Sequence, residues 1–111
     1  MRELSRIVMR SMFRIKVYLR TENRMIGYVG DLSESGLKLL TDDPLDVGAQ
    51  YALSLRMRGL DGELRATEVD GLCCWSQRGA RSGHVESGLR VDVPSSAYSA
   101  LIRGMRRRGK G

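Results

Sequence analysis

The feature that most constrains the fold of this 111-residue chain is a series of short apolar stretches between turn residues, followed by a helical pattern near the C-terminus. Residues 14–20 alternate charged and apolar side chains, which is the period of a half-buried strand, and residues 51–57 alternate in the same way. From residue 94 onward the apolar side chains instead recur at i, i+3, i+4 and i+7, as on one face of a helix. This apolar stripe consists of Tyr98, Leu101, Ile102 and Met105.

Four further strands are expected along the chain, at residues 25–30, 36–41, 63–76 and 84–91. Asp61-Gly62 favours a tight hairpin turn, because glycine adopts a positive φ without strain. Gly71 lies inside the longest stretch, where it predicts a β-bulge. Six strands with close turns and a terminal helix predict a mainly β fold, a small six-stranded antiparallel β-barrel whose C-terminal α-helix covers one opening.

Length and cysteine content exclude several classes of protein. A domain of this length buries a single modest core, and no apolar run approaches the roughly eighteen residues of a membrane span. The N-terminus leads into no apolar signal segment, so we expect a cytoplasmic protein. The two cysteines, Cys73 and Cys74, are adjacent. We expect them on opposite faces of one strand, where they form neither a disulfide framework nor a metal site.

Basic residues are concentrated at both ends of the chain. Residues 1–20 contain six basic residues and one acidic residue, and residues 103–111 contain five basic residues and no acidic one. Residues 21–102 contain eight basic and twelve acidic residues, so the body is mildly acidic. Basic ends bind phosphate groups on a nucleotide, a nucleic acid or a membrane surface, whereas an acidic body argues against a broad DNA- or RNA-binding face.

We therefore expect three parts, a basic N-terminal arm at 1–13, a barrel with its helix at 14–105 and a basic tail at 106–111. Four arginines near the N-terminus are spaced four residues apart, and like charges at this spacing repel each other in a helix. They are Arg2, Arg6, Arg10 and Arg14. The arm is therefore expected to be flexible and to become ordered only against an anionic group.

Two short motifs occur in register with this strand pattern. The first is an RxxxR motif from Arg10 to Arg14, at the start of the first expected strand. The second is a DxSxxG motif formed by Asp31, Ser33 and Gly36, between the second and third expected strands. The order of the motifs, the gap between them, a late Cys-Cys-Trp run and the closing helix resemble the PilZ domain, a bacterial receptor for cyclic di-GMP. The resemblance covers nearly the whole chain.

The chemistry of the motif residues suits such a ligand. Arginine matches the N7 and O6 acceptors of guanine and forms charge-assisted bonds with phosphates. Arg10 and Arg14 are therefore candidate ligand-binding residues, and Arg6 is a candidate third arginine. Asp31 can accept from the N1–H and N2–H₂ donors of guanine, and Ser33 can donate to a phosphate or ribose oxygen.

Gly36 and Trp75 complete the candidate site. Glycine permits a tight turn and the close approach of a ligand to the backbone. The resemblance implies that Trp75 stacks on a guanine, a contact that contributes about 1–3 kcal/mol per base, and that the site lies at the rim of the barrel. Structural explanations stay open: Asp31 and Ser33 as turn residues that bond their own backbone, and Trp75, the single tryptophan, as a core residue.

The resemblance implies a receptor rather than an enzyme, and the sequence contains no visible nucleophile–base pair, metal cluster or glycine-rich phosphate loop. Such a receptor would bind cyclic di-GMP, with no other cofactor, and relay the signal to an unidentified partner protein controlling motility, attachment or exopolysaccharide. We expect no DNA partner, no transmembrane segment, and a monomer or a ligand-dependent dimer. Two alternatives stay open. One is a small RNA-binding barrel, although such folds present two or three exposed aromatic residues; the other is a PilZ-fold adaptor that binds no nucleotide.

Overall fold

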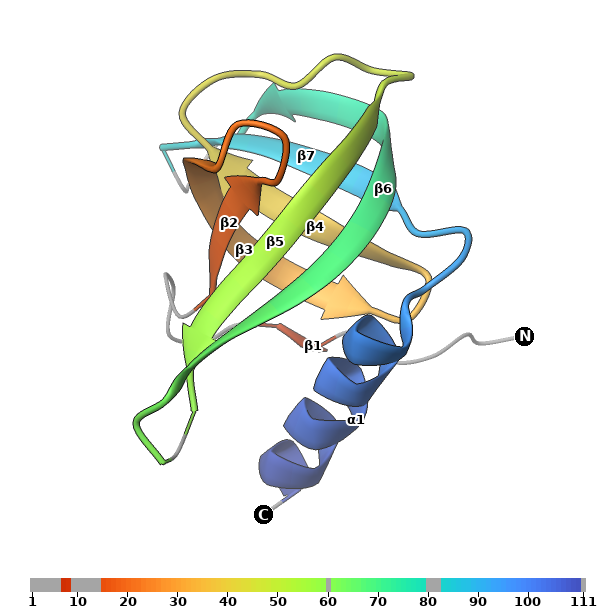
Figure 1. Cartoon of the computed structure of the whole chain (residues 1–111). Coiled ribbons are helices and arrows are strands. Elements are labelled where there is room, and N and C mark those ends of the chain that lie inside the picture. Colours follow the sequence, from red (N-terminus) through yellow and green to blue (C-terminus); the bar gives the residue numbers. More distant parts are fainter. Residues whose placement is uncertain (1–6, 9–14, 60, 80–82, 111) are drawn as a thin grey trace, which may run out of the picture.

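The computed structural model describes residues 7–8, 15–59, 61–79 and 83–110, with only the backbone described at 7–8 and 106–110. Within these residues the chain forms seven strands and one helix (Figure 1). The elements are β1 (Ile7–Val8), β2 (Lys16–Leu19), β3 (Arg24–Ser33), β4 (Gly36–Thr41), β5 (Gln50–Arg58), β6 (Leu64–Arg78), β7 (Val85–Arg90) and α1 (Ser96–Lys110).

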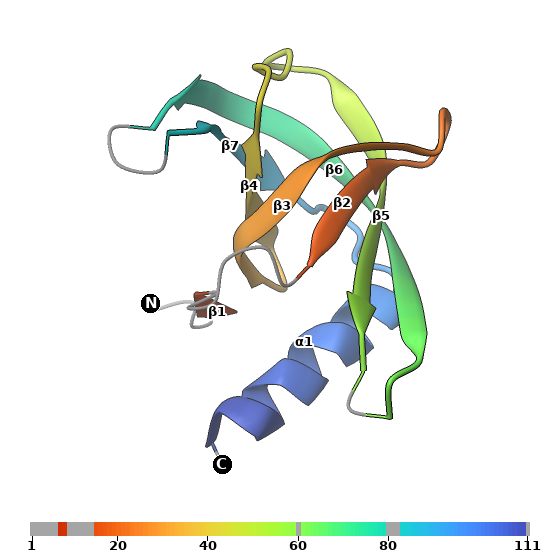
Figure 2. The same cartoon turned by 90° about the vertical axis from the view of Figure 1, so that its left-hand side faces the viewer.

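Six of the strands form a closed ring of antiparallel pairs. The order around the ring is β3-β2-β5-β6-β7-β4, and β4 pairs in turn with β3. β3 closes the ring because its ten residues are long enough to pair with β2 near one end and with β4 toward the other. Figure 2 shows β3 between these two strands. The six-stranded antiparallel barrel predicted from the sequence is confirmed, and closure removes the exposed edges of an open sheet.

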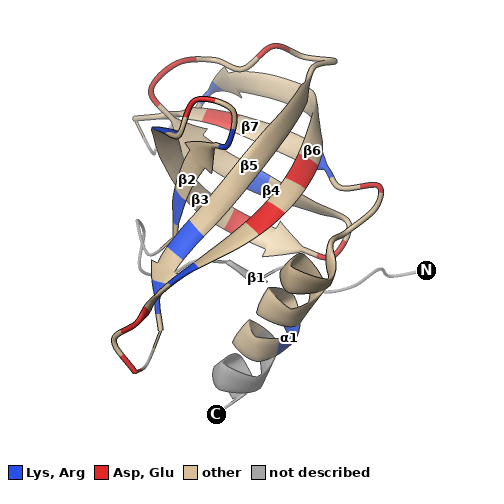
Figure 3. Ribbon diagram, in the orientation of Figure 1, with Lys and Arg blue, Asp and Glu red and all other residues tan. Residues whose placement is uncertain are grey.

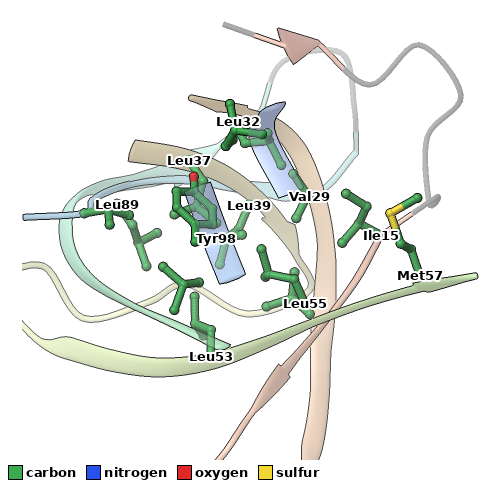
Figure 4. Packing of buried hydrophobic residues seen from close by; sticks show 14 of the residues in the cluster. Ile15, Val29, Leu32, Leu37, Leu39, Leu53, Leu55, Met57, Leu89 and Tyr98 are labelled. Carbon is green, nitrogen blue, oxygen red and sulfur yellow. The ribbon is translucent and has the colours of Figure 1, made fainter. Parts of the chain in front are cut away.

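The interior of the ring is filled by aliphatic side chains that alternate with outward-facing residues. In β4, Leu37 and Leu39 are buried, whereas Lys38 between them is only half-buried. On the other side of the ring β5 contributes Leu53 and Leu55 to the same cluster (Figure 4). Full burial of each such side chain contributes about 1.5–3 kcal/mol, which makes this cluster the main source of stability.

Helix α1 lies at one end of the ring, as the sequence predicts (Figure 1). Ser95 caps it: its hydroxyl oxygen accepts from the backbone N–H of Tyr98 at 3.1 Å and donates to the carbonyl of Glu68 in β6 at 2.7 Å. Two members of the apolar stripe, Tyr98 and Ile102, are fully buried in the core. The other two members are partly buried against it.

The basic ends of the chain are only partly described. Of the expected arm at 1–13, the structure describes Ile7–Val8, which form β1 and pair with β3 so that the second residue lies opposite Asp31. The sequence predicts a flexible arm, whereas main-chain hydrogen bonds join these two residues to β3. At the other end α1 continues to Lys110, so most of the expected tail at 106–111 is helical.

The bulge in β6 lies further along the strand than the sequence predicts. Gly71, the expected bulge, pairs regularly with β5. The register with β7 shifts instead between Cys73 and Trp75, which makes Cys74 the extra residue. Gly71 has a packing reason to be small, since a Cβ there would lie 3.1 Å from the side chain of Leu89.

Acidic side chains gather in the loops at the end of the ring opposite α1 (Figure 3). They belong to the turn between β2 and β3 and to the loop after β4, and include Glu22, Asp42, Asp43 and Asp46. These carboxylates disfavour a phosphate ligand at this end, although Arg24 pairs with Glu22 of the same turn. In the part of the chain that the structure describes, no helix is both long and apolar enough to span a membrane.

Candidate ligand-binding site

The DxSxxG motif spans the end of β3 and the turn to β4, and a bulge determines which way it faces. The register between the two strands shifts between Val29 and Asp31, so Gly30 is the extra residue. Side chains alternate along a strand, and one extra residue therefore reverses the faces of those that follow. As a result Leu32 joins the core, and Asp31 lies on the outer face directly opposite Lys38.

The bulge in β6 has the same effect on Trp75. Cys73 is buried and pairs with Leu89 of the core. With Cys74 as the extra residue, Trp75 lies on the outer face opposite Gly88, and 40% of its surface is exposed. Trp75 is therefore a surface residue, which removes the structural explanation that the sequence left open for it.

The motif and the tryptophan belong to one transverse row on the outer face of β3, β4, β7 and β6. The strand registers place side by side, in this order, Asp31, Lys38, Gly88 and Trp75. Three inter-strand spacings separate the two ends, about 14 Å along the sheet. β1 continues the row beyond Asp31, because Val8 pairs with that residue. The row is long enough for an extended ligand with a polar group at one end and a flat ring at the other.

The indole of Trp75 covers the backbone of Gly88. A Cβ added at Gly88 would lie 2.2 Å from the indole Nε1 and 2.4 Å from Cε2, so only glycine fits beneath the ring. The inner side of the indole is thus packed against β7, while part of the ring faces solvent. A half-exposed aromatic ring held in this way suits stacking on a base.

Lys38 lies between two carboxylates near the middle of the transverse row. Its Nζ is 4.0 Å from Oδ2 of Asp31 and 3.9 Å from Oε1 of Glu86. The side chain of Asp31 is only 12% exposed, so its charge is less screened by water than that of a surface aspartate. The ammonium group balances one of the two negative charges.

A cavity of about 230 Å³ lies along the same face, lined by residues that include Lys38, Trp75, Gly88 and Arg90. Arg90 donates to both carboxylate oxygens of Asp92, at 2.7 and 3.2 Å. This hydrogen-bonded pair raises the pKa of Arg90, which is a cation at the edge of the cavity. The cavity therefore combines an aromatic wall with two basic side chains.

Ser33 and Gly36 pair with each other where β3 turns into β4. Ser33 is buried, and its hydroxyl lies 3.4 Å from both the Ser35 Oγ and the Gly36 carbonyl, which are long distances for hydrogen bonds. A Cβ on Gly36 would lie 2.7 Å from the carbonyl oxygen of Leu89, and its φ is not positive. Glycine is thus required for the close approach of β4 to β7, rather than for the turn conformation suggested by the sequence.

Three of the candidate residues lie outside the part of the chain that the structure describes. They are Arg6, Arg10 and Arg14. Two described neighbours bracket the RxxxR motif. Val8 pairs opposite Asp31, and Ile15 is fully buried in the core.

Two residues of the transverse row were not identified as site residues from the sequence. Lys38 follows Gly36 by two positions, and alternate residues of a strand share a face. This spacing could therefore have identified Lys38 as a site residue. Gly88 offers no such signal, since its contact with Trp75 depends on the pairing of β6 with β7 and on the bulge.

The described part of the chain also contains two free cysteines and a second cavity. Within the described ranges, no group of three or more His, Cys, Asp or Glu residues could hold a metal ion. Cys73 is buried and burial raises the pKa of its thiol, whereas Cys74 is exposed, as expected for opposite faces. A larger, mainly apolar cavity of about 330 Å³ lies between α1 and the β5–β6 hairpin, lined in part by Met57 and Leu101.

The solved structures that share this fold include the following two. The inhibitor of motility MotI/DgrA from Bacillus subtilis matches with a TM-score of 0.72 and 14% identity, over 98% of this chain and 52% of that chain. The PilZ domain of YcgR from Escherichia coli, solved with c-di-GMP, matches with a TM-score of 0.61 and 16% identity, over 98% and 94% of the two chains. This chain thus spans about half the length of the Bacillus protein.

No curated protein matches the sequence. A family model, described as the PilZ domain, matches residues 2–107. That range includes both motifs, every strand and most of α1. The match covers nearly the entire sequence, and the chain therefore belongs to the PilZ domain family.

Proposed function

We propose that this chain is a receptor that binds cyclic di-GMP across the transverse row. The observation that supports this most directly is that Asp31 and Trp75 share one outer face, about 14 Å apart along the sheet. Asp31 offers two acceptors for the N1–H and N2–H₂ groups of one guanine. Trp75 offers an aromatic face for a base, and Ser33 offers a hydroxyl for a phosphate or ribose oxygen.

The phosphates of the ligand require cations from elsewhere. Lys38 faces two carboxylates, and Arg90 is bonded to Asp92. The described part of the row therefore supplies little net positive charge for a ligand with two phosphates. This deficit favours a binding mode in which arginines of the N-terminal segment complete the site.

Chain connectivity supports the same assignment. Val8 pairs opposite Asp31 at the end of the row. Arg6 and Arg10 are each two residues from Val8, which corresponds to at most about 7 Å of extended chain. We assign phosphate and guanine contacts to Arg10 and Arg14, with Arg6 as a third cation.

Isothermal titration calorimetry on the full chain tests this function. We expect saturable binding of cyclic di-GMP and much weaker binding of GTP and of a short single-stranded RNA. Binding should quench the fluorescence of Trp75, the single tryptophan. Comparable RNA binding that falls steeply with added salt would favour the RNA-binding barrel instead, and no binding of any nucleotide would favour a protein adaptor.

We also assign the output to a separate partner protein. The resemblance to the family, and a motility inhibitor among the proteins of similar fold, favour motility as the controlled process. The chain itself is proposed to be a monomer or a ligand-dependent dimer. Light scattering during size-exclusion chromatography, with and without cyclic di-GMP, distinguishes these states by mass.

A further inference from the structure

Tyr98 joins helix α1 to the ligand-binding motif through the core. Its side chain is fully buried in the cluster drawn in Figure 4. The Tyr98 hydroxyl lies 2.6 Å from the carbonyl oxygen of Ser33 and 3.1 Å from that of Gly36. A hydroxyl has one proton, so the Ser33 carbonyl is its main acceptor, and the Gly36 carbonyl shares the bond more weakly.

These two carbonyls belong to the residues at either end of the β3–β4 turn. Ser33 and Gly36 pair with each other, with Glu34 and Ser35 between them. Tyr98 therefore contacts the first and last residues of the turn from inside the ring. A second contact comes from the segment before α1, where the Val91 N–H donates to the Ser35 carbonyl at 2.9 Å.

The turn has two sides with different roles. Its inner carbonyls bond Tyr98, while Asp31 lies on the outer face opposite Lys38. Among the described residues, the buried Ser33 hydroxyl has two contacts, both of 3.4 Å. The backbone of the turn therefore contributes to holding both motif residues in place, beside the ion pair between Asp31 and Lys38.

We propose that Tyr98 is a positioning residue for the ligand: its hydroxyl fixes the β3–β4 turn and so couples the docking of α1 to ligand binding. The inference rests on the proposed binding of cyclic di-GMP. Without the hydroxyl the turn opens more easily, and the ligand must order it on binding, which lowers affinity. By reciprocity, bound ligand slows the hydrogen exchange of backbone amides in the first turn of α1.

Tyr98→Phe tests this proposal because it keeps the ring and removes only the hydroxyl. Calorimetric titration should show a dissociation constant for cyclic di-GMP that is about three- to tenfold higher, as expected for loss of one buried hydrogen bond. Without ligand, the backbone amides of residues 33–36 should exchange hydrogen faster in the variant. Exchange at 61–63, in the distant β5–β6 turn, should not change.

Thr41→Val is a matched control at the other end of β4. The Thr41 hydroxyl is also buried, and it donates to the carbonyl of Asp43 at 2.7 Å. This variant should lower the melting temperature about as much as Tyr98→Phe, yet change the dissociation constant by less than about twofold.

Three outcomes overturn the proposal, and they differ in what else they refute. Equal loss of affinity in the Thr41 and Tyr98 variants would attribute the effect to general stability. Unchanged affinity in Tyr98→Phe would refute the positioning role and leave the proposed function standing. Failure of the wild-type chain to bind cyclic di-GMP would refute both.

Discussion

Replacing Gly88 with alanine should displace Trp75 and remove its contribution to ligand binding. The added Cβ would lie 2.2, 2.4 and 2.9 Å from three indole atoms. Non-bonded carbon atoms need roughly 3.5 Å, so the ring must move by more than about 1 Å. Gly88 is not among the glycines with positive φ, and the backbone therefore accepts alanine without strain.

The expected loss is larger for binding than for stability. Stacking on an aromatic side chain contributes about 1–3 kcal/mol per base, so the dissociation constant for cyclic di-GMP should rise by about 5- to 150-fold. Loss of part of the packing between the ring and β7 costs about 1 kcal/mol of unfolding free energy, less than the roughly 1.5–3 kcal/mol for full burial of a large apolar side chain. Alanine recovers about 0.5–1 kcal/mol of this because glycine is unfavourable inside a strand.

Tryptophan fluorescence and calorimetry measure the two effects, since Trp75 is the single tryptophan of the chain. In Gly88→Ala the emission should shift to longer wavelength without ligand, and quenching by the ligand should decrease. The control is Trp75→Ala, in which a second change of Gly88→Ala should alter the dissociation constant by less than about twofold. If Gly88→Ala raised the dissociation constant equally in the Trp75→Ala variant, the reasoning would be refuted. Unchanged emission and affinity in Gly88→Ala alone would refute it as well.

Three further predictions concern the motifs and the cysteines. Asp31→Ala should weaken cyclic di-GMP more than cyclic di-AMP, because adenine lacks the matching pair of donors; equal losses in titrations of both ligands would identify Asp31 as a turn residue. Arg14→Ala should cost about 1.5–3 kcal/mol of binding free energy through lost charge-assisted bonds, with an unchanged circular dichroism spectrum; wild-type affinity would exclude Arg14 from the site. Ellman's reagent at pH 8 should modify only Cys74 in the native protein and both thiols after unfolding, because burial shields Cys73 and raises the pKa of its thiol; rapid reaction of two native thiols would contradict the burial of Cys73.

Local pattern was sufficient to predict the six strands of the ring and the helix, but not β1, whose residues were expected to lie in a flexible arm. The stripe from Tyr98 to Met105 is a helix because its apolar spacing and the Ser95 cap are local properties. The turn at Asp61-Gly62 forms because the chain needs a positive φ there, which Gly62 adopts at 83°. Once six strands with close turns were predicted, a small closed barrel was the arrangement that buries their apolar faces.

The direction in which the site residues face was decided by tertiary structure. Alternation along a strand predicts a face only until a bulge adds one residue, and two bulges precede the ends of the row, at Gly30 before Asp31 and at Cys74 before Trp75. A glycine in a strand does not by itself predict a bulge, since Gly71 pairs regularly with β5. A bulge depends on the register of two strands distant in sequence, and so no local pattern could place the motif and the tryptophan on one face.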